Sequence, residues 1–154
     1  MALLCERCGS TFDKPTYPSV PVLCWPCLNF ISRINQQVHS NLRRARRCGE
    51  PATLTVQEWI ETLEHFNYRC AYCFRDNGLE EYGYLPVYMD HFIPLGMGIG
   101  TVRWNCTPAC KSCNIVKRHL HPSVITLIPK EALERVQTYL TSLQNAEEIR
   151  PKTP

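Results

Sequence analysis

The feature that most constrains this chain is a set of four Cys-x-x-Cys pairs, which use eight of its 10 cysteines. The pairs are CERC (Cys5, Cys8), CWPC (Cys24, Cys27), CAYC (Cys70, Cys73) and CKSC (Cys110, Cys113). Two thiolates at this spacing can reach one ion from a single tight turn, and two such turns complete a tetrahedral zinc site. The sequence therefore predicts two structural Zn²⁺ sites.

Pairs that are neighbours in the sequence combine most simply. The first two would form an N-terminal zinc ribbon or knuckle, and the last two would form a second site that closes a longer loop. Sequence alone leaves an exchange of pairs between the sites open. CWPC has the spacing of a redox motif, but no βαβ pattern surrounds it, which argues against redox chemistry. Of the two remaining cysteines, Cys48 stays unassigned, and we expect Cys106 to be a buried free thiol.

Charge and hydropathy narrow the class of protein further. No apolar run is long enough to cross a membrane, and MALLCERCGS lacks the basic start and long apolar core of a secretory signal. We therefore expect an intracellular, cytoplasmic protein, in which metal binding by cysteine is favoured over disulfides. The net charge is only +3, but four arginines cluster at Arg43, Arg44, Arg46 and Arg47. Such a cluster favours a polyanion such as nucleic acid as the partner, although a solvated helix face or helix-dipole pairing also accounts for it.

The pattern of apolar residues predicts a small α+β chain. Steps of three and four residues predict a helix over 28–47 and a last helix from about Pro129. Thr55 followed by Glu58 is a capping box, which starts a helix leading to Cys70. We expect a strand to end near Asp90, a glycine-rich loop to follow it, and a short helix to run from Cys110 to the His-Pro step at 121–122.

A second set of motifs lies between and around the last two cysteine pairs. DHFIPLGMGIGTVRWN carries Asp90, His91 and Asn105, and CKSCNIVK carries Asn114 and Lys117. In order and spacing, these words resemble the HNH (His-Asn-His) endonuclease family in its zinc-bearing form. The resemblance covers about residues 70–122 and implies a zinc-stapled ββα-metal (treble-clef-like) nuclease core with flanking helices.

The resemblance implies metal-dependent DNA cleavage by phosphodiester hydrolysis. His91 would be the general base, since a free imidazole has a pKa of about 6.5 and is mostly neutral at pH 7. Asp90 and Asn114 offer oxygen ligands to a catalytic Mg²⁺ or Mn²⁺. Asn105 would hold the His91 ring in its productive orientation. Further candidates for phosphate contacts are Lys111, Lys117 and Arg118.

These motifs predict a zinc-ribbon-like module over 1–28, a basic helix or linker over 29–50, an HNH nuclease domain over 51–148 and a disordered tail over 149–154. The main alternative is a non-catalytic zinc-finger DNA-binding protein, which would not need Asp90, His91 and Asn114 together. A zinc-dependent base deaminase is excluded because the chain lacks its H-x-E and P-C-x-x-C motifs. We expect His119 and His121 to be surface residues or phosphate contacts.

The sequence leaves several properties open. They are the DNA target, nicking against double-strand cleavage, the oligomeric state and the biological pathway. Small stand-alone proteins of the HNH family often belong to phages or mobile elements, so the resemblance extends to that setting as well.

Overall fold

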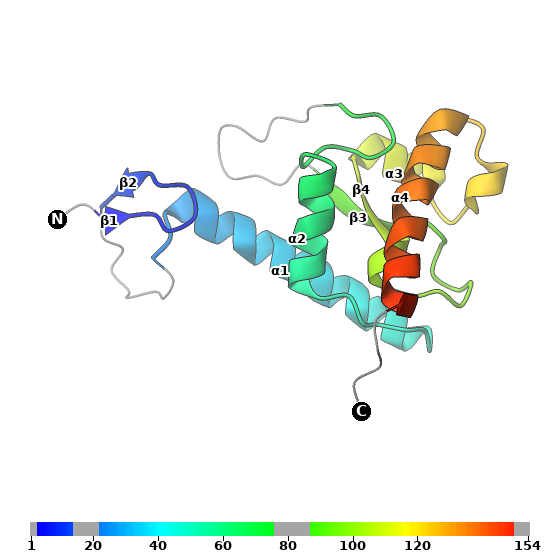
Figure 1. Cartoon of the computed structure of the whole chain (residues 1–154), viewed down its shortest axis with the longest axis horizontal. Coiled ribbons are helices and arrows are strands. Elements are labelled where there is room, and N and C mark those ends of the chain that lie inside the picture. The colour runs from blue at the N-terminus through cyan, green and yellow to red at the C-terminus, as the bar shows by residue number, and fades with distance from the viewer. Residues whose placement is uncertain (1–2, 14–21, 76–86, 150–154) are drawn as a thin grey trace.

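A computed structural model describes residues 3–13, 22–75 and 87–149 of the 154-residue chain. Within these ranges the protein is a small α+β fold with four α-helices and two two-stranded antiparallel sheets (Figure 1), as the sequence predicts. Within the same ranges, no helix is long and apolar enough to cross a membrane. The sequence Asn-Gly at 77–78 is a turn signal, and both this predicted turn and residues 150–154 of the expected tail lie outside the described residues.

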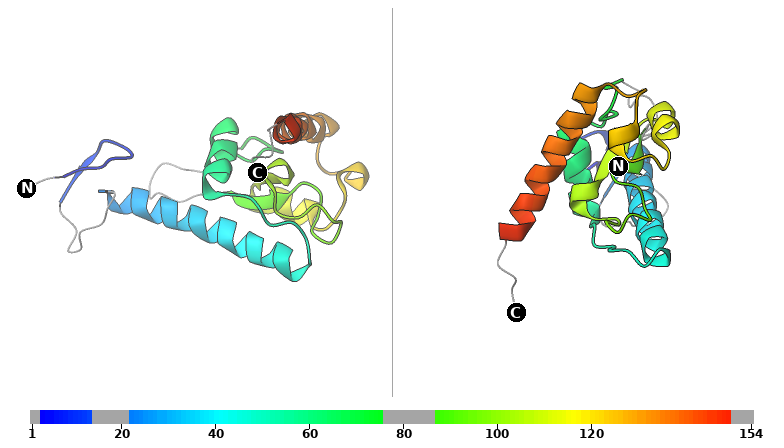
Figure 2. Two further views of the ribbon diagram at one scale, coloured as in Figure 1. Left: turned by 60° about the horizontal axis from the view of Figure 1, so that its bottom comes forward. Right: turned by 90° about the vertical axis from the view of Figure 1, so that its right-hand side faces the viewer.

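The longest helix, α1 (Trp25–Arg47), extends from the N-terminal end of the molecule along one side of the rest of the fold (Figures 1 and 2). Pro26 lies in its first turn, where a fixed φ suits the helix and no backbone N–H is needed. Phe30, Ile34, Val38 and Leu42 are buried at four-residue steps, so the predicted amphipathic helix is confirmed, although Leu28 at the start of the expected apolar stripe is exposed. The expected boundary at residue 28 falls inside this helix.

At the N-terminal end of α1, the strands β1 (Leu3–Leu4) and β2 (Thr11–Phe12) pair antiparallel. A separate small group of side chains is buried there, namely Cys5, Leu23, Cys24 and Cys27.

Helix α2 (Val56–His65) packs against α1. Its predicted capping box is present, with Thr55 and Glu58 exchanging backbone-to-side-chain hydrogen bonds of 2.8 and 3.2 Å. The helix ends at His65 rather than running on to Cys70, because Asn67 and Tyr68 adopt positive φ angles that a right-handed helix does not allow. The indole of Trp59 is buried and donates to Gln37 of α1, which ties the two helices together.

The second sheet positions the site. Strand β3 (Tyr88–His91) pairs antiparallel with β4 (Cys106–Ala109), and Asp90 lies opposite Thr107. A short 3₁₀ helix, η1 (Arg103–Asn105), precedes β4, and α3 (Lys111–Lys117) follows it directly. Helix α3 is shorter than predicted because Arg118 adopts a φ of 47°. Strand β4 was not predicted, since it is four residues long and contains Pro108.

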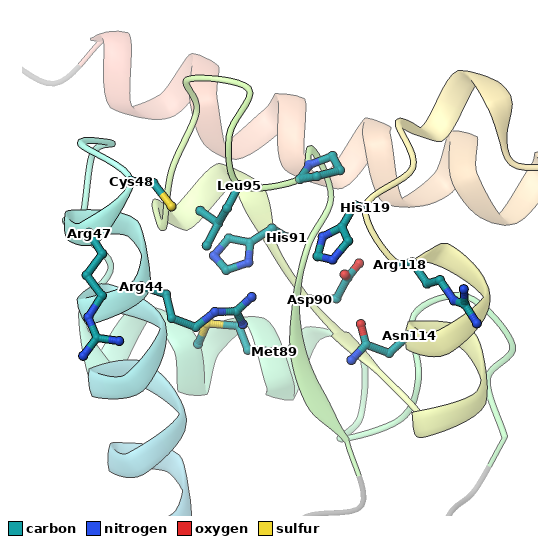
Figure 3. A pocket seen from close by; sticks show the side chains of 11 residues that line it. Arg44, Arg47, Cys48, Met89, Asp90, His91, Leu95, Asn114, Arg118 and His119 are labelled. Atoms are coloured by element: carbon teal, nitrogen blue, oxygen red, sulfur yellow. The ribbon is translucent and has the colours of Figure 1, made fainter.

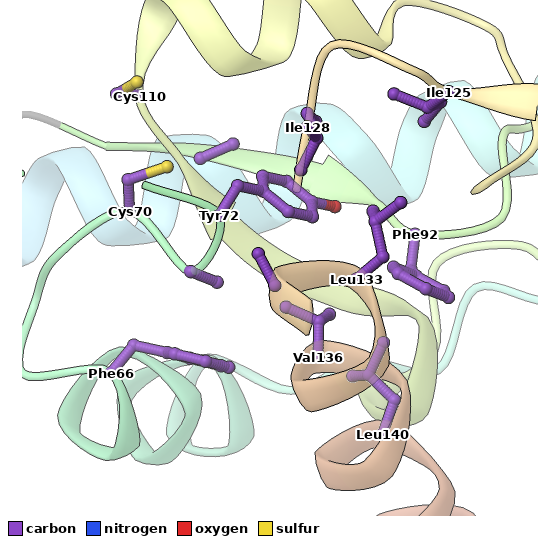
Figure 4. Close-up of a cluster of buried hydrophobic side chains, with 13 residues drawn as sticks. Phe66, Cys70, Tyr72, Phe92, Cys110, Ile125, Ile128, Leu133, Val136 and Leu140 are labelled. Carbon is purple, nitrogen blue, oxygen red and sulfur yellow. The ribbon is translucent and has the colours of Figure 1, made fainter. Parts of the chain in front are cut away.

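The chain then forms a second 3₁₀ helix, η2 (Pro122–Val124), and the last helix, α4 (Lys130–Ile149), whose predicted apolar face is confirmed by buried Leu133, Val136 and Leu140. This face covers the largest apolar cluster, which also contains Phe66, Tyr72, Phe92 and the cysteines Cys70 and Cys110 (Figure 4). A second cluster joins α1, α2 and β3 around Trp59. The segment expected to be a nuclease domain therefore shares its core with α1.

Candidate functional site

The eight paired cysteines gather into two groups of four, each built from pairs that are neighbours in the sequence. Within each group all sulfur atoms lie within 4.8 Å of one another. Two of the separations, 3.6 Å for Cys8–Cys24 and 3.8 Å for Cys73–Cys110, match the ~3.8 Å expected between ligands of a tetrahedral ion at a Zn–S distance of ~2.3 Å. Both groups could therefore hold Zn²⁺, and the pairing by sequence proximity is confirmed.

The backbone around each group has the form of a metal-binding turn. The first cysteine of a pair accepts a hydrogen bond at its carbonyl from the residue after the second cysteine, at 2.9 Å for both Gly9–Cys5 and Phe74–Cys70. The sulfur atoms of Cys5 and Cys110 accept N–H groups at 3.3 and 3.4 Å. These bonds favour the thiolate form that a metal requires.

A cavity of about 510 Å³ lies where α1, β3 and α3 meet (Figure 3). Its described lining includes the predicted catalytic and metal residues Asp90, His91 and Asn114. Arg44 and Arg47 line it from α1, and Arg118 lines it just after α3. Three arginines and one carboxylate therefore face this space, so it suits an anionic ligand.

Other predicted site residues lie outside this lining. Arg43 and Arg46 are exposed on α1, and Lys111 is exposed at the start of α3. His119 and His121, which were expected at the surface, are both exposed. His119 lines the cavity, and His121 does not. Cys48 is exposed at the cavity wall, and Cys106 is the fully buried free thiol that the sequence predicts.

Asp90 is buried and firmly held. Its carboxylate accepts a 2.6 Å hydrogen bond from the hydroxyl of Tyr72, and the ammonium of Lys117 lies 3.2 Å from each of its oxygens. Burial raises the pKa of this carboxyl above its usual range, and the Lys117 charge and the Tyr72 hydrogen bond oppose that rise. Tyr72 stands between Cys70 and Cys73, and Lys117 follows Cys113 on α3, so both partners of Asp90 come from the segments that carry the second cysteine group.

Lys117 requires a correction to the sequence analysis. It was predicted to contact phosphates, but its side chain is fully buried and its ammonium also donates to the carbonyl of His91 at 2.5 Å. The burial of Lys117 could not be predicted from the sequence, because no local pattern distinguishes it from the exposed residues near it on the helix. Only the packing of α3 on β3 brings it to a buried carboxylate, which stabilises its charge.

His91 is also buried, and its Nε2 lies 2.8 Å from the hydroxyl of Thr101. Burial is the largest of the causes that lower the pKa of His91 to about 4, and the nearby positive charges of Arg44 and Lys117 contribute the rest. The imidazole is therefore neutral across the physiological pH range, as a general base requires. Thr101 was missed by sequence reasoning, since a threonine after a glycine loop has no distinctive pattern.

Asn105 requires a second correction. It was predicted to hold the His91 ring, but its side chain bonds to backbone groups instead. Its amide oxygen accepts the N–H of Ile93 at 2.8 Å, and its amide nitrogen donates to the carbonyls of Ile93 and Gly100 at 3.0 and 2.9 Å. Asn105 therefore fixes the two ends of the loop between β3 and η1, and it acts on His91 through the backbone.

The glycine loop is anchored to the segment after α1. Glu50 accepts the N–H groups of Gly96 and Gly98 at 2.8 and 2.6 Å through one carboxylate oxygen. At Gly100, a Cβ atom would lie 2.1 Å from the carbonyl oxygen of Pro51, so only glycine fits this approach. These contacts hold Thr101 in place beside His91.

Comparison of the chain with family models, with curated proteins and with solved structures finds no match.

Proposed function

We propose that this protein is a metal-dependent DNA endonuclease of the HNH type, with a zinc-stapled ββα-metal core formed by β3, β4 and α3. The observation that carries the proposal is the cavity lined by Asp90, His91 and Asn114 together with arginines. Residues that are separate in the sequence meet there in the combination that phosphodiester hydrolysis needs: a neutral imidazole, oxygen ligands for a cation, and positive charge for phosphate.

His91 is the base in this proposal. A neutral imidazole with a free ring nitrogen accepts the proton of a water molecule as that water attacks phosphorus. The depressed pKa keeps the base unprotonated, but it also makes His91 a weak proton acceptor in the free protein. An anionic phosphate bound beside it would raise that pKa and strengthen the base.

Asp90 and Asn114 would hold the divalent ion. An ionised carboxylate has about four acceptor positions, and the Tyr72 hydroxyl and the ammonium bridging both oxygens use three of those on Asp90. Asp90 nevertheless lines the cavity, and Asn114 is half-buried in the same lining. Such a donor set fits Mg²⁺ or Mn²⁺, which keep several waters and take the remaining ligands from phosphate. When bound, the ion would supply charge stabilisation for the phosphate and the leaving 3′-oxygen.

The arginines would bind the substrate. Arg44 and Arg47 on α1 and Arg118 after α3 stand on opposite sides of Asp90 and His91 (Figure 3). Guanidinium groups bind phosphate oxygens in bidentate geometry. A DNA backbone lying across the cavity would therefore place its scissile phosphate against β3.

A second candidate is a non-catalytic zinc-finger DNA-binding protein. The ion pair between Asp90 and Lys117 favours it, because the cavity's only lining carboxylate among the described residues is already neutralised. Such a protein would use the arginines and the cysteine groups alone.

The test is cleavage of supercoiled plasmid by zinc-loaded protein, with and without added Mg²⁺ or Mn²⁺. We expect metal-dependent nicking or linearisation, reduced about 10²- to 10⁴-fold in His91→Ala, as for loss of a general base. His121→Ala, an exposed histidine outside the cavity, is the matched control and should keep full activity. If neither wild type nor variant cleaves, but both bind a DNA duplex equally, the zinc-finger alternative holds.

A further inference from the structure

Thr101 lies within the segment DHFIPLGMGIGTVRWN, but the sequence analysis assigns it no role. Its side chain is fully buried, and its hydroxyl lies 2.8 Å from Nε2 of His91 and 3.1 Å from the backbone carbonyl oxygen of Asn41 in α1. Its own backbone is fixed as well, since its N–H donates to Pro51 and its carbonyl accepts from Thr53 and Leu54. The hydroxyl is thus held between the helix and the proposed base.

The position of the hydroxyl proton follows from these two contacts. A hydroxyl has one proton to donate, and a carbonyl oxygen can only accept. The proton of Thr101 therefore lies toward Asn41, and the lone pair of the hydroxyl oxygen faces His91 and accepts from Nε2–H. In a neutral imidazole with its proton on Nε2, Nδ1 carries the free lone pair. The hydrogen bonds of the described residues leave Nδ1 without a partner, and His91 lines the cavity.

We propose that Thr101 is a positioning residue that fixes His91 as the Nε2–H tautomer, with Nδ1 as the proton acceptor. The role of Nδ1 in DNA cleavage rests on the proposed function, whereas the tautomer does not. If Thr101 donated to Nε2 instead, the proton of the ring would lie on Nδ1 and the nitrogen available to the cavity could not take up another. The carbonyl of Asn41 decides between these two states.

The same contact makes α1 part of the site. The side-chain oxygen of Asn41 accepts from Arg44 at 3.4 Å, and Arg44 lines the cavity. One turn of α1 therefore supplies both an arginine for the substrate and the carbonyl that orients Thr101. A helix that served only as a linker would have no such contact.

The tautomer can be measured without activity. Long-range ¹H–¹⁵N spectra of ¹⁵N-histidine-labelled, zinc-loaded protein, recorded near pH 7 without Mg²⁺, distinguish the two tautomers, and His91→Asn assigns the signal. We expect the Nε2–H form in the wild type and in Thr101→Ser, which keeps the hydroxyl. Thr101→Val has the same shape without it, and we expect a mixture of tautomers there. An Nδ1–H form in the wild type, or an unchanged tautomer in a folded Thr101→Val, would overturn the proposal.

Cleavage supplies the second measurement. We expect Thr101→Val to lower kcat by about 10- to 10²-fold, less than loss of the base itself, with KM for DNA nearly unchanged. Thr101→Ser should stay within a few-fold of wild type. A wild type that fails to cleave at all would refute the endonuclease, while the spectra would still decide the tautomer. If Thr101→Val does not fold, the tautomer of the wild type alone decides, because the Nδ1–H form would refute the assignment.

Discussion

The two cysteine groups have the same ligands and spacing but very different surroundings. Among the described residues, the N-terminal group forms most of its own small core: three of its cysteines are buried together with Leu23, and Phe12 and Ile31 pack against them partly buried. The second group borders the largest apolar cluster, which includes Val136 and Leu140 of α4 (Figure 4). The fold around the N-terminal group would therefore depend on a bound metal, whereas a metal in the second group would add stability to a region that already has an apolar core.

The second group is also connected to the candidate site, and the first group is not. Tyr72 and Lys117 reach from its segments to Asp90, and Asn114 is the residue after Cys113. Among the described residues, no comparable side-chain contact joins the N-terminal group to the cavity. Two cysteine groups of the same composition thus have different surroundings, because hydrogen bonds connect the segments of only the second group to Asp90.

Removing one cysteine from each group should have the largest effects, and these should differ between the groups. We expect Cys73→Ser to lose one zinc per chain and protection from hydrogen exchange throughout β3, β4 and α3, with a loss of several kcal/mol of stability. Cys8→Ser should also lose one zinc, but lose protection only in the N-terminal hairpin and the first turns of α1, because the rest of that helix packs on α2. Zinc analysis and hydrogen exchange measure both, and Cys48→Ser, in neither group, is the control. Global unfolding of Cys8→Ser would contradict the comparison.

The next largest effect concerns the buried ion pair between Lys117 and Asp90, beside the second cysteine group. Lys117→Met leaves Asp90 buried without its partner, and we expect it to cost about 3–5 kcal/mol of unfolding free energy in urea titrations. Adding Asp90→Asn should recover much of this loss, since the uncompensated charge is then gone. Lys111→Met, on the exposed side of the same helix, should change stability by less than about 0.5 kcal/mol. Equal costs for the two lysines would refute the buried pair.

The buried His91 should also make the stability of the protein depend on pH. The folded protein keeps His91 neutral down to a pKa of about 4, while an unfolded chain binds that proton near pH 6.5. Between these values the unfolded state holds more protons, so stability falls as pH falls, by roughly 3 kcal/mol in total, and is unaffected above pH ~6.5. His91→Asn should lack this component. Urea unfolding of wild type and His91→Asn from pH 7.5 to 5 measures this contribution. Metal release lowers the stability of both proteins, so it cancels in the difference between their unfolding free energies. A difference that stays constant with pH would contradict the prediction.

The smallest expected effects lie in the two metal-binding turns. Each turn ends in a residue with positive φ, Gly9 at 72° and Phe74 at 54°. Gly9→Ala should cost about 1 kcal/mol, because alanine is strained in this region. Phe74→Gly relieves that strain but removes the contact of the Phe74 ring with the guanidinium of Arg135, 3.9 Å from its centroid, so we expect little net change. Zinc release to a competing chelator measures both turns, and a greater loss for Phe74→Gly would reverse the expected order.

Local sequence patterns predicted the two cysteine groups and the helices α1, α2 and α4. The Cys-x-x-Cys spacing predicted two groups of four cysteines, because two residues on one turn can reach a shared point without help from the rest of the chain. Which pairs combine was left open by the sequence and is seen only in the structure. Apolar periodicity gave α1 and α4, and the capping box at Thr55 gave the start of α2, since these are interactions between residues three or four apart. Asp90, His91 and Asn114 were likewise found as candidates by their order.

The tertiary structure decided which partner each candidate has. Lys117 is a buried counter-ion rather than a phosphate contact, Asn105 holds a loop rather than a ring, and Thr101 instead of Asn105 contacts His91. Lys117 and Asp90 are 27 positions apart, and Thr101 and His91 are 10 positions apart, and no local pattern marks these contacts. Hydrogen bonds between distant side chains depend on where β3, α1 and α3 pack against one another, and that packing is a property of the whole chain.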